Sequence, residues 1–152
     1  MASFSRSLPF MSGRRRVILA AMSVAFGNIL PARAAQNVLA EFGGKDGLTA
    51  IMEDFDTFLM ADSRTRPFFE KVDRKRIKQQ LVIQFCALLG GDCVYSGGNM
   101  KGIHRGLQIT KEDFNALIEA LQEAMDKHKV SFRAQNKLLA VLAPMHRDIV
   151  EK

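Results

Sequence analysis

Histidine and cysteine are the side chains in this 152-residue chain that most readily bind metals or form covalent bonds, and it contains three histidines and two cysteines. The histidines form no HExxH motif or other paired spacing typical of a zinc site, and the cysteines form no CxxC pair. No GxSxG or Cys-His-Asn pattern indicates a nucleophilic enzyme. These patterns therefore support neither a zinc site nor a nucleophilic enzyme.

Each histidine also has an ordinary structural explanation. His104 lies in a short segment between Gly102 and Gly106, where periodicity alone does not distinguish a ligand from a packed or surface residue. His128 stands between two lysines at the predicted end of a helix, where a solvated imidazole interacts favourably with the helix dipole. His146 is predicted on an exposed face near the end of the chain. The residues alone leave the role of His104 open.

The elements that must position these residues are helices. Apolar residues recur at helical spacing along the chain after residue 40, and no comparable run alternates with period two. Thr110 and Asp113 have the spacing of a capping pair. The sequence predicts an all-α fold with one core and no internal repeat. The expected helices cover 48–59, 74–89, 100–106, 110–125 and, from Ser131 or Phe132, the residues up to 149, with an apolar corner at 67–69 and a loop at 91–99.

The composition is that of an ordinary globular protein, with 47% hydrophobic and 25% charged residues. The formal net charge of +6 is concentrated at one end, because residues 1–34 contain five basic residues and no acidic one. The remainder has 17 basic and 16 acidic residues. The charge therefore gives no indication of a nucleic-acid partner.

Residues 1–34 have the order of a secretory signal. Arg14-Arg15-Arg16 precedes an apolar stretch at 17–30, and small residues follow in Pro31-Ala32-Arg33-Ala34. We expect cleavage after Ala34, which leaves residues 35–152 as the mature domain in the periplasm or outside the cell, without stable membrane insertion. An uncleaved membrane anchor is the alternative, although about 14 apolar residues are too few to span a bilayer. The export route, general secretory or twin-arginine, stays open.

The two cysteines lie seven positions apart, on either side of Gly90-Gly91. In an exported protein, this arrangement predicts a disulfide between Cys86 and Cys93 that ties the end of one helix to the following loop. The alternative is two buried free thiols.

Several short segments occur in an order that resembles the group I truncated haemoglobins. The resemblance covers the chain from about Leu39 to Val150 and implies a truncated globin fold, a two-over-two helical sandwich around a haem. No single segment is specific, but together they form a strong match. They are Glu41-Phe42-Gly43-Gly44, Asp54-Phe55, Ala61-Asp62, Pro67-Phe68-Phe69, Leu89-Gly90-Gly91, Tyr95-Ser96-Gly97, Met100 with His104, Gly106-Leu107-Gln108-Ile109-Thr110, and Pro144 through Val150.

The resemblance implies that His104 is the proximal ligand of a haem b iron. The chain has no CxxCH motif, so the haem would not be attached in the c-type way. Most of the other residues expected to contact the haem would also fit an ordinary core, and only a haem-sized gap distinguishes the two. These residues are Phe69, Ile77, Gln80, Leu81, Phe85, Tyr95, Met100 and Leu117.

The ligand side departs from the family pattern. Many group I members have a tyrosine directly after the phenylalanine matched by Phe55, where this chain has Asp56. An ionised carboxylate only accepts hydrogen bonds, so Asp56 is expected either to be protonated in the pocket or, preferably, to turn to solvent. Leu81 occupies the usual inward position of the distal glutamine, which makes Gln80 the preferred donor to a bound ligand, with solvent exposure as its alternative.

The resemblance implies reversible binding of O₂, and of NO and CO, for oxygen carriage, storage or sensing. An enzyme on the same haem is the alternative, either an NO dioxygenase or a weak peroxidase, and it would need an unidentified electron donor. A helical interaction module without haem is the third class, but it gives no reason for His104 in its glycine-flanked segment.

Overall fold

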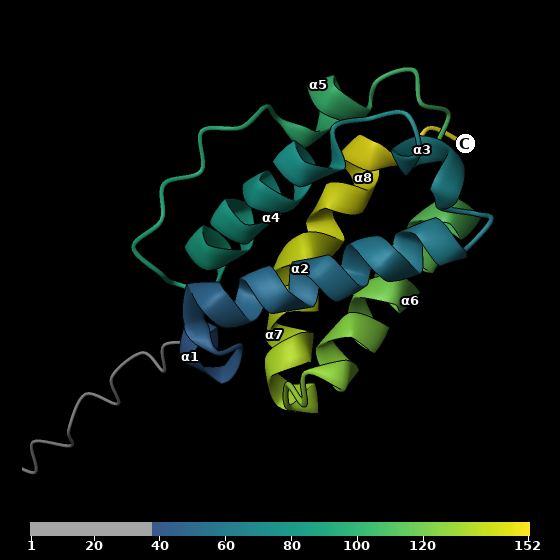
Figure 1. Cartoon of the computed structure of the whole chain (residues 1–152). Coiled ribbons are helices and arrows are strands. Elements are labelled where there is room, and N and C mark those ends of the chain that lie inside the picture. Colours follow the sequence, from purple (N-terminus) through teal and green to yellow (C-terminus); the bar gives the residue numbers. More distant parts are fainter. Residues whose placement is uncertain (1–37) are drawn as a thin grey trace, which may run out of the picture. The chain divides into compact units, whose positions relative to one another are not determined.

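The computed structural model describes residues 38–152, which are helical with no strand in this range. The predicted signal segment, 1–34, lies outside the described residues. Among the described helices, none is both long enough and apolar enough to cross a membrane. The elements are α1 (Val38–Glu41), α2 (Gly44–Ala61), α3 (Arg66–Phe69), α4 (Arg74–Leu88), α5 (Met100–His104), α6 (Lys111–Lys127), α7 (Phe132–Leu142), the 3₁₀ helix η1 (Ala143–Met145) and α8 (His146–Ile149) (Figure 1).

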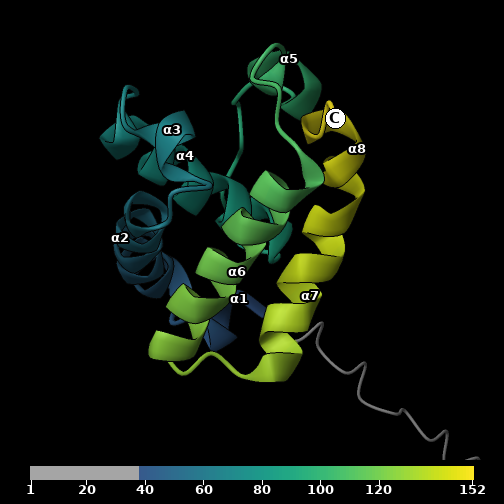
Figure 2. The same ribbon diagram turned by 90° about the vertical axis from the view of Figure 1, so that its right-hand side faces the viewer.

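The four long helices form two layers. Helices α2 and α4 pack against each other in one layer, and α6 and α7 form the second (Figure 2). Contacts between α2 and α6 and between α4 and α7 join the layers. This arrangement confirms the predicted all-α, two-over-two fold.

The core follows from the helical spacing of apolar residues. On α2, Leu48, Ile51, Phe55 and Leu59 are all nearly inaccessible to solvent, because residues three and four positions apart share one helix face. Buried residues of the second layer complete the same cluster, among them Leu121, Met125 and Leu138.

Two helix starts agree with the predicted capping residues. Thr110 Oγ1 accepts a hydrogen bond from the Asp113 amide, and the Asp113 carboxylate accepts one from the Thr110 amide, which completes a capping box. Ser131 is the N-cap of α7, so this helix begins at Phe132. Helix α4 ends at Leu88, one residue before its predicted end.

The prediction of one continuous last helix was wrong. Helix α7 ends at Leu142, and the chain continues through η1 into α8. Pro144 explains the break, because proline has no amide hydrogen and its ring clashes with the carbonyl of the preceding turn. The apolar spacing of Val141, Met145 and Ile149 continues across the break, so periodicity alone did not reveal it.

Two histidines have partners that the sequence did not predict. His128 is not simply solvated, because its Nε2 lies 2.8 Å from Asp54 Oδ2, while Lys127 Nζ lies 2.6 Å from Asp54 Oδ1. His146 is partly buried rather than exposed, and its ring packs edge-on against Phe114 with a centroid distance of 4.9 Å. Both contacts join helices of the fold.

Candidate functional site

A cavity of about 530 Å³ lies among α3, α4, α5, α6 and the residues around η1. This volume is typical of small-molecule sites, which are mostly apolar with a few polar groups. Its lining is dominated by aliphatic and aromatic side chains, including five of the eleven phenylalanines, Phe55, Phe68, Phe69, Phe85 and Phe114.

Helix α4 supplies one wall of the cavity. Ile77, Leu81 and Phe85 recur every four residues and give it an apolar stripe. A second stripe one position earlier, Arg76 and Gln80 with Gln84, gives the same wall its polar edge. The pitch of an α-helix therefore places both kinds of side chain on one surface.

The short helix α5 presents His104 to the cavity. Asn99 caps this helix, because its Oδ1 accepts a hydrogen bond from the Gly102 amide at 2.7 Å. His104 Nδ1 lies 2.8 Å from the carbonyl oxygen of Met100. A carbonyl only accepts, so Nδ1 carries a hydrogen, and in the neutral ring the lone pair is then on Nε2. This hydrogen bond fixes the ring in the form that a metal-binding histidine requires.

All nine residues predicted to form the site line this one cavity. They come from five parts of the chain: Phe69 from α3; Ile77, Gln80, Leu81 and Phe85 from α4; Tyr95 from the loop before α5; Met100 and His104 from α5; and Leu117 from α6. The fold thus brings them together around a gap of suitable size, and their roles toward a cofactor stay predictions.

Asp56 does not line the cavity. Its carboxylate accepts a hydrogen bond from Arg74 Nη1 at 3.1 Å, and the side chain is 16% exposed. Both expectations for Asp56 were therefore wrong: the side chain is not in the cavity lining, and it is mostly buried against Arg74 of α4 rather than turned to solvent. Its neighbour Phe55 lines the cavity in its place.

The Gln80 side chain is partly buried in the cavity wall. Among residues 38–152 it has no hydrogen-bond partner, so its amide group is available to a bound molecule. Gln84 and Arg76 also line the cavity, although neither was predicted to do so. Gln84 is 7% exposed, and its Nε2 lies 4.0 Å from Met100 Sδ. The spacing of four residues from Gln80 is the sequence signal that places all three on one helix face.

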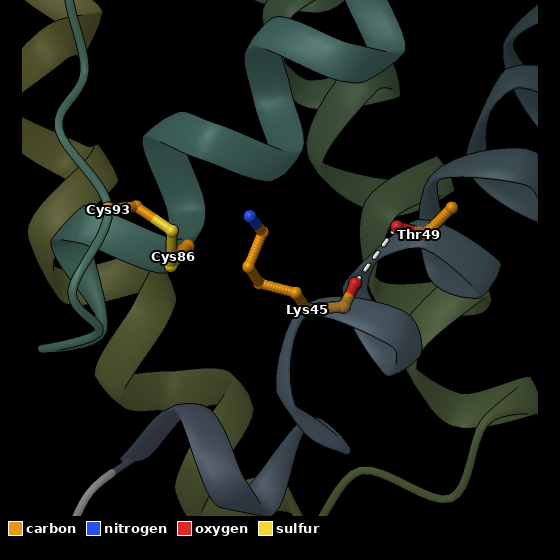
Figure 3. Close-up of a disulfide and its surroundings, with 4 residues drawn as sticks. All are labelled: Lys45, Thr49, Cys86 and Cys93. Carbon is orange, nitrogen blue, oxygen red and sulfur yellow. Dashed lines mark hydrogen bonds between the residues drawn. A yellow bond between two sulfur atoms is a disulfide. The ribbon is translucent and has the colours of Figure 1, made fainter.

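A disulfide joins the end of α4 to the loop before α5. Cys86 is fully buried and bonded to Cys93, with the two Cα atoms 5.8 Å apart (Figure 3). A Cβ atom at Gly91 would lie 2.6 Å from Cys86 Sγ, so glycine is needed for the close return of the chain. The disulfide thereby fixes the start of the loop that leads to His104.

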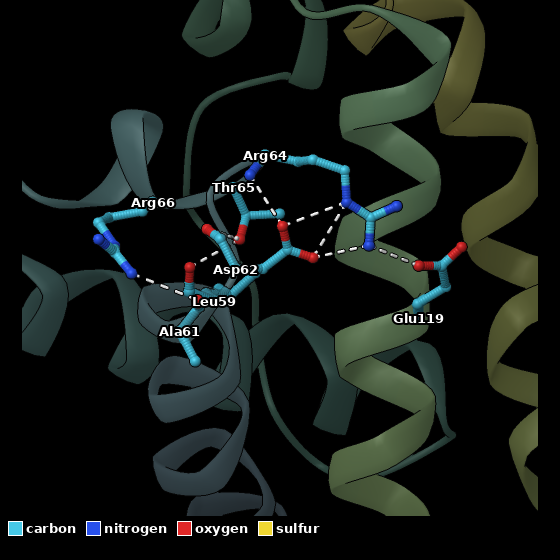
Figure 4. A network of polar contacts seen from close by, with 7 residues as sticks. All are labelled: Leu59, Ala61, Asp62, Arg64, Thr65, Arg66 and Glu119. Atoms are coloured by element: carbon cyan, nitrogen blue, oxygen red, sulfur yellow. Dashed lines mark hydrogen bonds and ion pairs between the residues drawn. The ribbon is translucent and has the colours of Figure 1, made fainter.

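A polar network fixes the turn between α2 and α3 (Figure 4). The Asp62 carboxylate accepts hydrogen bonds from the Arg64 backbone amide at 2.8 Å and from its guanidinium at 2.7 Å, and the same guanidinium pairs with Glu119 of α6. The hydrogen bonds from Arg64 hold the pKa of Asp62 below its ordinary value. Thr65, whose hydroxyl donates to the Leu59 carbonyl at 2.6 Å, is buried at the cavity. The network therefore positions the turn that brings α3 to the cavity wall.

Comparison with known proteins gives a consistent set of matches. Residues 37–151 match the family model for bacterial-like globins. The chain is 29% identical over 113 residues to the group 1 truncated hemoglobin GlbN of Mycolicibacterium paratuberculosis, covering 74% of this chain and 83% of the relative. It is 27% identical over 117 residues to the group 1 truncated hemoglobin of Tetrahymena pyriformis, covering 77% and 97%. The crystal structure of the latter in the Fe(III) form superposes with a TM-score of 0.72 over 76% of this chain and 98% of that one, at 27% identity.

Proposed function

Because the chain belongs to the bacterial-like globin family, we propose that the cavity binds one haem b without a covalent link, with His104 as the ligand of the iron. Ligand binding at a haem is the general activity that this membership supports. The observation that carries the assignment to His104 is its hydrogen bond to the Met100 carbonyl, which holds the ring by Nδ1 and leaves Nε2 as the nitrogen available to a metal in the neutral ring.

The residues present fit a haem. The cavity is large and mostly apolar, and the polar residues of its lining are few: Thr65, Arg76, Gln80, Gln84, Tyr95, His104 and Asp113. Phe69, Phe85 and Leu117 would hold the porphyrin by apolar contact. The exposed Arg76 gives the lining a cation suited to the carboxylates that haem b carries.

When bound, the haem supplies an iron with a position open to a diatomic ligand. The apolar side chains of α4 would exclude water from this side, and the Gln80 amide, which lines the same cavity, would donate a hydrogen bond to the ligand. The function proposed is reversible binding of O₂, with NO and CO as further ligands, for carriage, storage or sensing.

We also propose that the protein is exported, with residues 1–34 removed and residues 35–152 located in the periplasm or outside the cell. The disulfide between Cys86 and Cys93 supports this location, because such bonds persist in oxidising compartments. The mass of the protein recovered from the periplasm of a bacterial host tests this proposal. We expect the mass of residues 35–152, and a chain that begins at Met1 would contradict cleavage.

Optical spectra test the haem assignment. Residues 35–152 are reconstituted with haem b and recorded ferric, ferrous, and ferrous with O₂ or CO, beside His104→Ala. His128→Ala is the matched control, because His128 pairs with Asp54 outside the cavity. We expect a stoichiometric complex in the wild type and the control, extractable with acid acetone, and loss of the histidine-bound spectrum in His104→Ala. An unchanged spectrum in His104→Ala would remove His104 as the ligand.

A further inference from the structure

The segment that follows α5 has an unusual backbone. Gly106 and Gln108 both have positive φ, 80° and 58°. Glycine adopts this conformation freely, whereas a glutamine there is unfavourable unless its surroundings hold it. The turn begins immediately after His104, whose carbonyl accepts a hydrogen bond from the Leu107 amide at 3.2 Å. Whatever holds this turn therefore also holds the end of α5.

The partner of this turn is Glu151, which follows α8. One carboxylate oxygen accepts a hydrogen bond from the Gly106 amide at 2.8 Å, and the other accepts one from the Gln108 amide at 2.7 Å. The backbone amide of Glu151 donates to the Ile109 carbonyl at 2.9 Å. The two amide hydrogen bonds hold the pKa of Glu151 below its ordinary value, so this carboxylate is ionised at neutral pH. One residue thus holds both left-handed positions of the turn.

Helix α5 depends on contacts outside itself for its position. It has five residues, too few for a helix to be stable by itself. Its first turn is capped by Asn99, and its last turn leads into the segment held by Glu151. Helix α5 also contacts α8, the helix that directly precedes Glu151 (Figure 2). The hydrogen bond from His104 Nδ1 to the Met100 carbonyl fixes the imidazole relative to α5, but it does not fix α5 relative to the cavity.

We propose that Glu151 is a positioning residue for His104: its carboxylate, which does not line the cavity, fixes the turn after α5 and thereby the approach of the imidazole to the bound haem. This inference rests on the proposed function. Without the carboxylate, the two amides lose their acceptor and the turn can relax. The imidazole then has more freedom, and its bond to the iron weakens.

The test compares the holoproteins of wild type, Glu151→Ala and Glu151→Gln. Glu123→Gln is the control, because Glu123 is exposed on α6 and its side chain has no hydrogen-bond partner within residues 38–152. The first readout is the iron–histidine stretching band of the ferrous, ligand-free protein by resonance Raman spectroscopy. The second is the rate of haem transfer to excess apomyoglobin. The third is hydrogen exchange of the Gly106 and Gln108 amides in the protein without haem.

In Glu151→Ala we expect a broader iron–histidine band at lower frequency, haem loss faster by about tenfold, and faster exchange at the two amides. Glu151→Gln retains one acceptor oxygen without the charge, so its values should lie between those of Glu151→Ala and wild type. The control should match wild type. If Glu151→Ala does not fold, the shift in Glu151→Gln decides.

The outcomes separate this inference from the proposed function. A wild-type protein that binds no haem would contradict the proposed function itself. A wild type that binds haem through His104, with the same Raman band and haem-loss rate in both Glu151 variants, would overturn the positioning role alone. A lower melting temperature with an unchanged Raman band would assign Glu151 to stability only, and would also overturn it.

Discussion

At the scale of single residues, the three histidines differ in what their ring nitrogens contact. His128 is engaged by Asp54, and the His146 ring packs on Phe114. Among the three, only His104 lines the cavity, and its Nδ1 also donates a hydrogen bond to the Met100 carbonyl within the same helix. The contacts, rather than the residue type, therefore make His104 the candidate metal ligand among the three.

Gln80 is expected to slow the release of O₂. Its amide lines the cavity and has no competing partner among the described residues, so Gln80→Ala should remove a hydrogen bond to the ligand. The loss of one such hydrogen bond should make O₂ release from Gln80→Ala faster than from wild type by roughly tenfold. Stopped-flow measurement of O₂ dissociation checks this, with exposed Gln79→Ala as the matched control. Equal rates in the two variants would show that Gln80 does not reach the ligand.

At the residue scale, the sequence grouped residues that line one cavity but did not reveal partners that are distant in sequence. The nine site residues lie in segments whose spacing to His104 placed them correctly around the cavity. Asp56 was misjudged because its partner, Arg74, lies 18 positions away, and Glu151 was not considered because its partner Gly106 lies 45 positions away. A pair of this kind has no periodicity that a single sequence could reveal.

At the scale of elements, the helices were largely predictable because each buries one apolar face. The stripe on α2 and the capping box of α6 were both visible in the sequence. The cavity itself was not, because Leu81, Phe85 and Leu117 would suit a filled core equally well. Whether apolar side chains meet or leave a gap depends on the distance between helices, which no local pattern encodes.

The disulfide is the covalent link between two of these elements, α4 and the loop before α5. Its reduction should lower the free energy of unfolding by about 2.5 kcal/mol, because the unfolded chain regains the freedom of a short loop. Urea unfolding of residues 35–152 with and without reductant measures this difference in the free energy of unfolding. Reduction alters only the two cysteine side chains. The Cys86→Ser, Cys93→Ser double variant should be insensitive to reductant. Equal stability of the oxidised and reduced wild type would contradict the prediction.

At the scale of the whole molecule, ion pairs join parts of the chain that the apolar core also brings together. Glu41 of α1 pairs with Lys137 of α7, and Asp54 of α2 pairs with Lys127 and His128 at the end of α6. Each carboxylate thus connects elements far apart in sequence. Exposed pairs of this kind contribute little individually, but they share one dependence on pH.

That dependence can be worked out from the direction of the pKa shifts. The side-chain hydrogen bond from Lys127, followed by that from His128, holds the pKa of Asp54 below its ordinary value of 3.8. Lys137, with Ser131, likewise lowers the pKa of Glu41 from 4.5. A carboxyl whose pKa is lower in the folded state stabilises that state above its unfolded pKa, and the contribution is lost as the pH falls through the folded pKa. The protein should therefore lose stability progressively below about pH 4.5.

Urea unfolding of the haem-free protein between pH 7 and pH 2.5 tests this, with Asp54→Asn as the comparison. At pH 7 the variant should be less stable than wild type, because it lacks the charge that Lys127 and His128 bind. As the pH falls, wild type protonates Asp54 and loses the same interaction, so the two stability curves should converge. Curves that stay parallel down to pH 2.5 would show that the pairing of Asp54 does not stabilise the folded state.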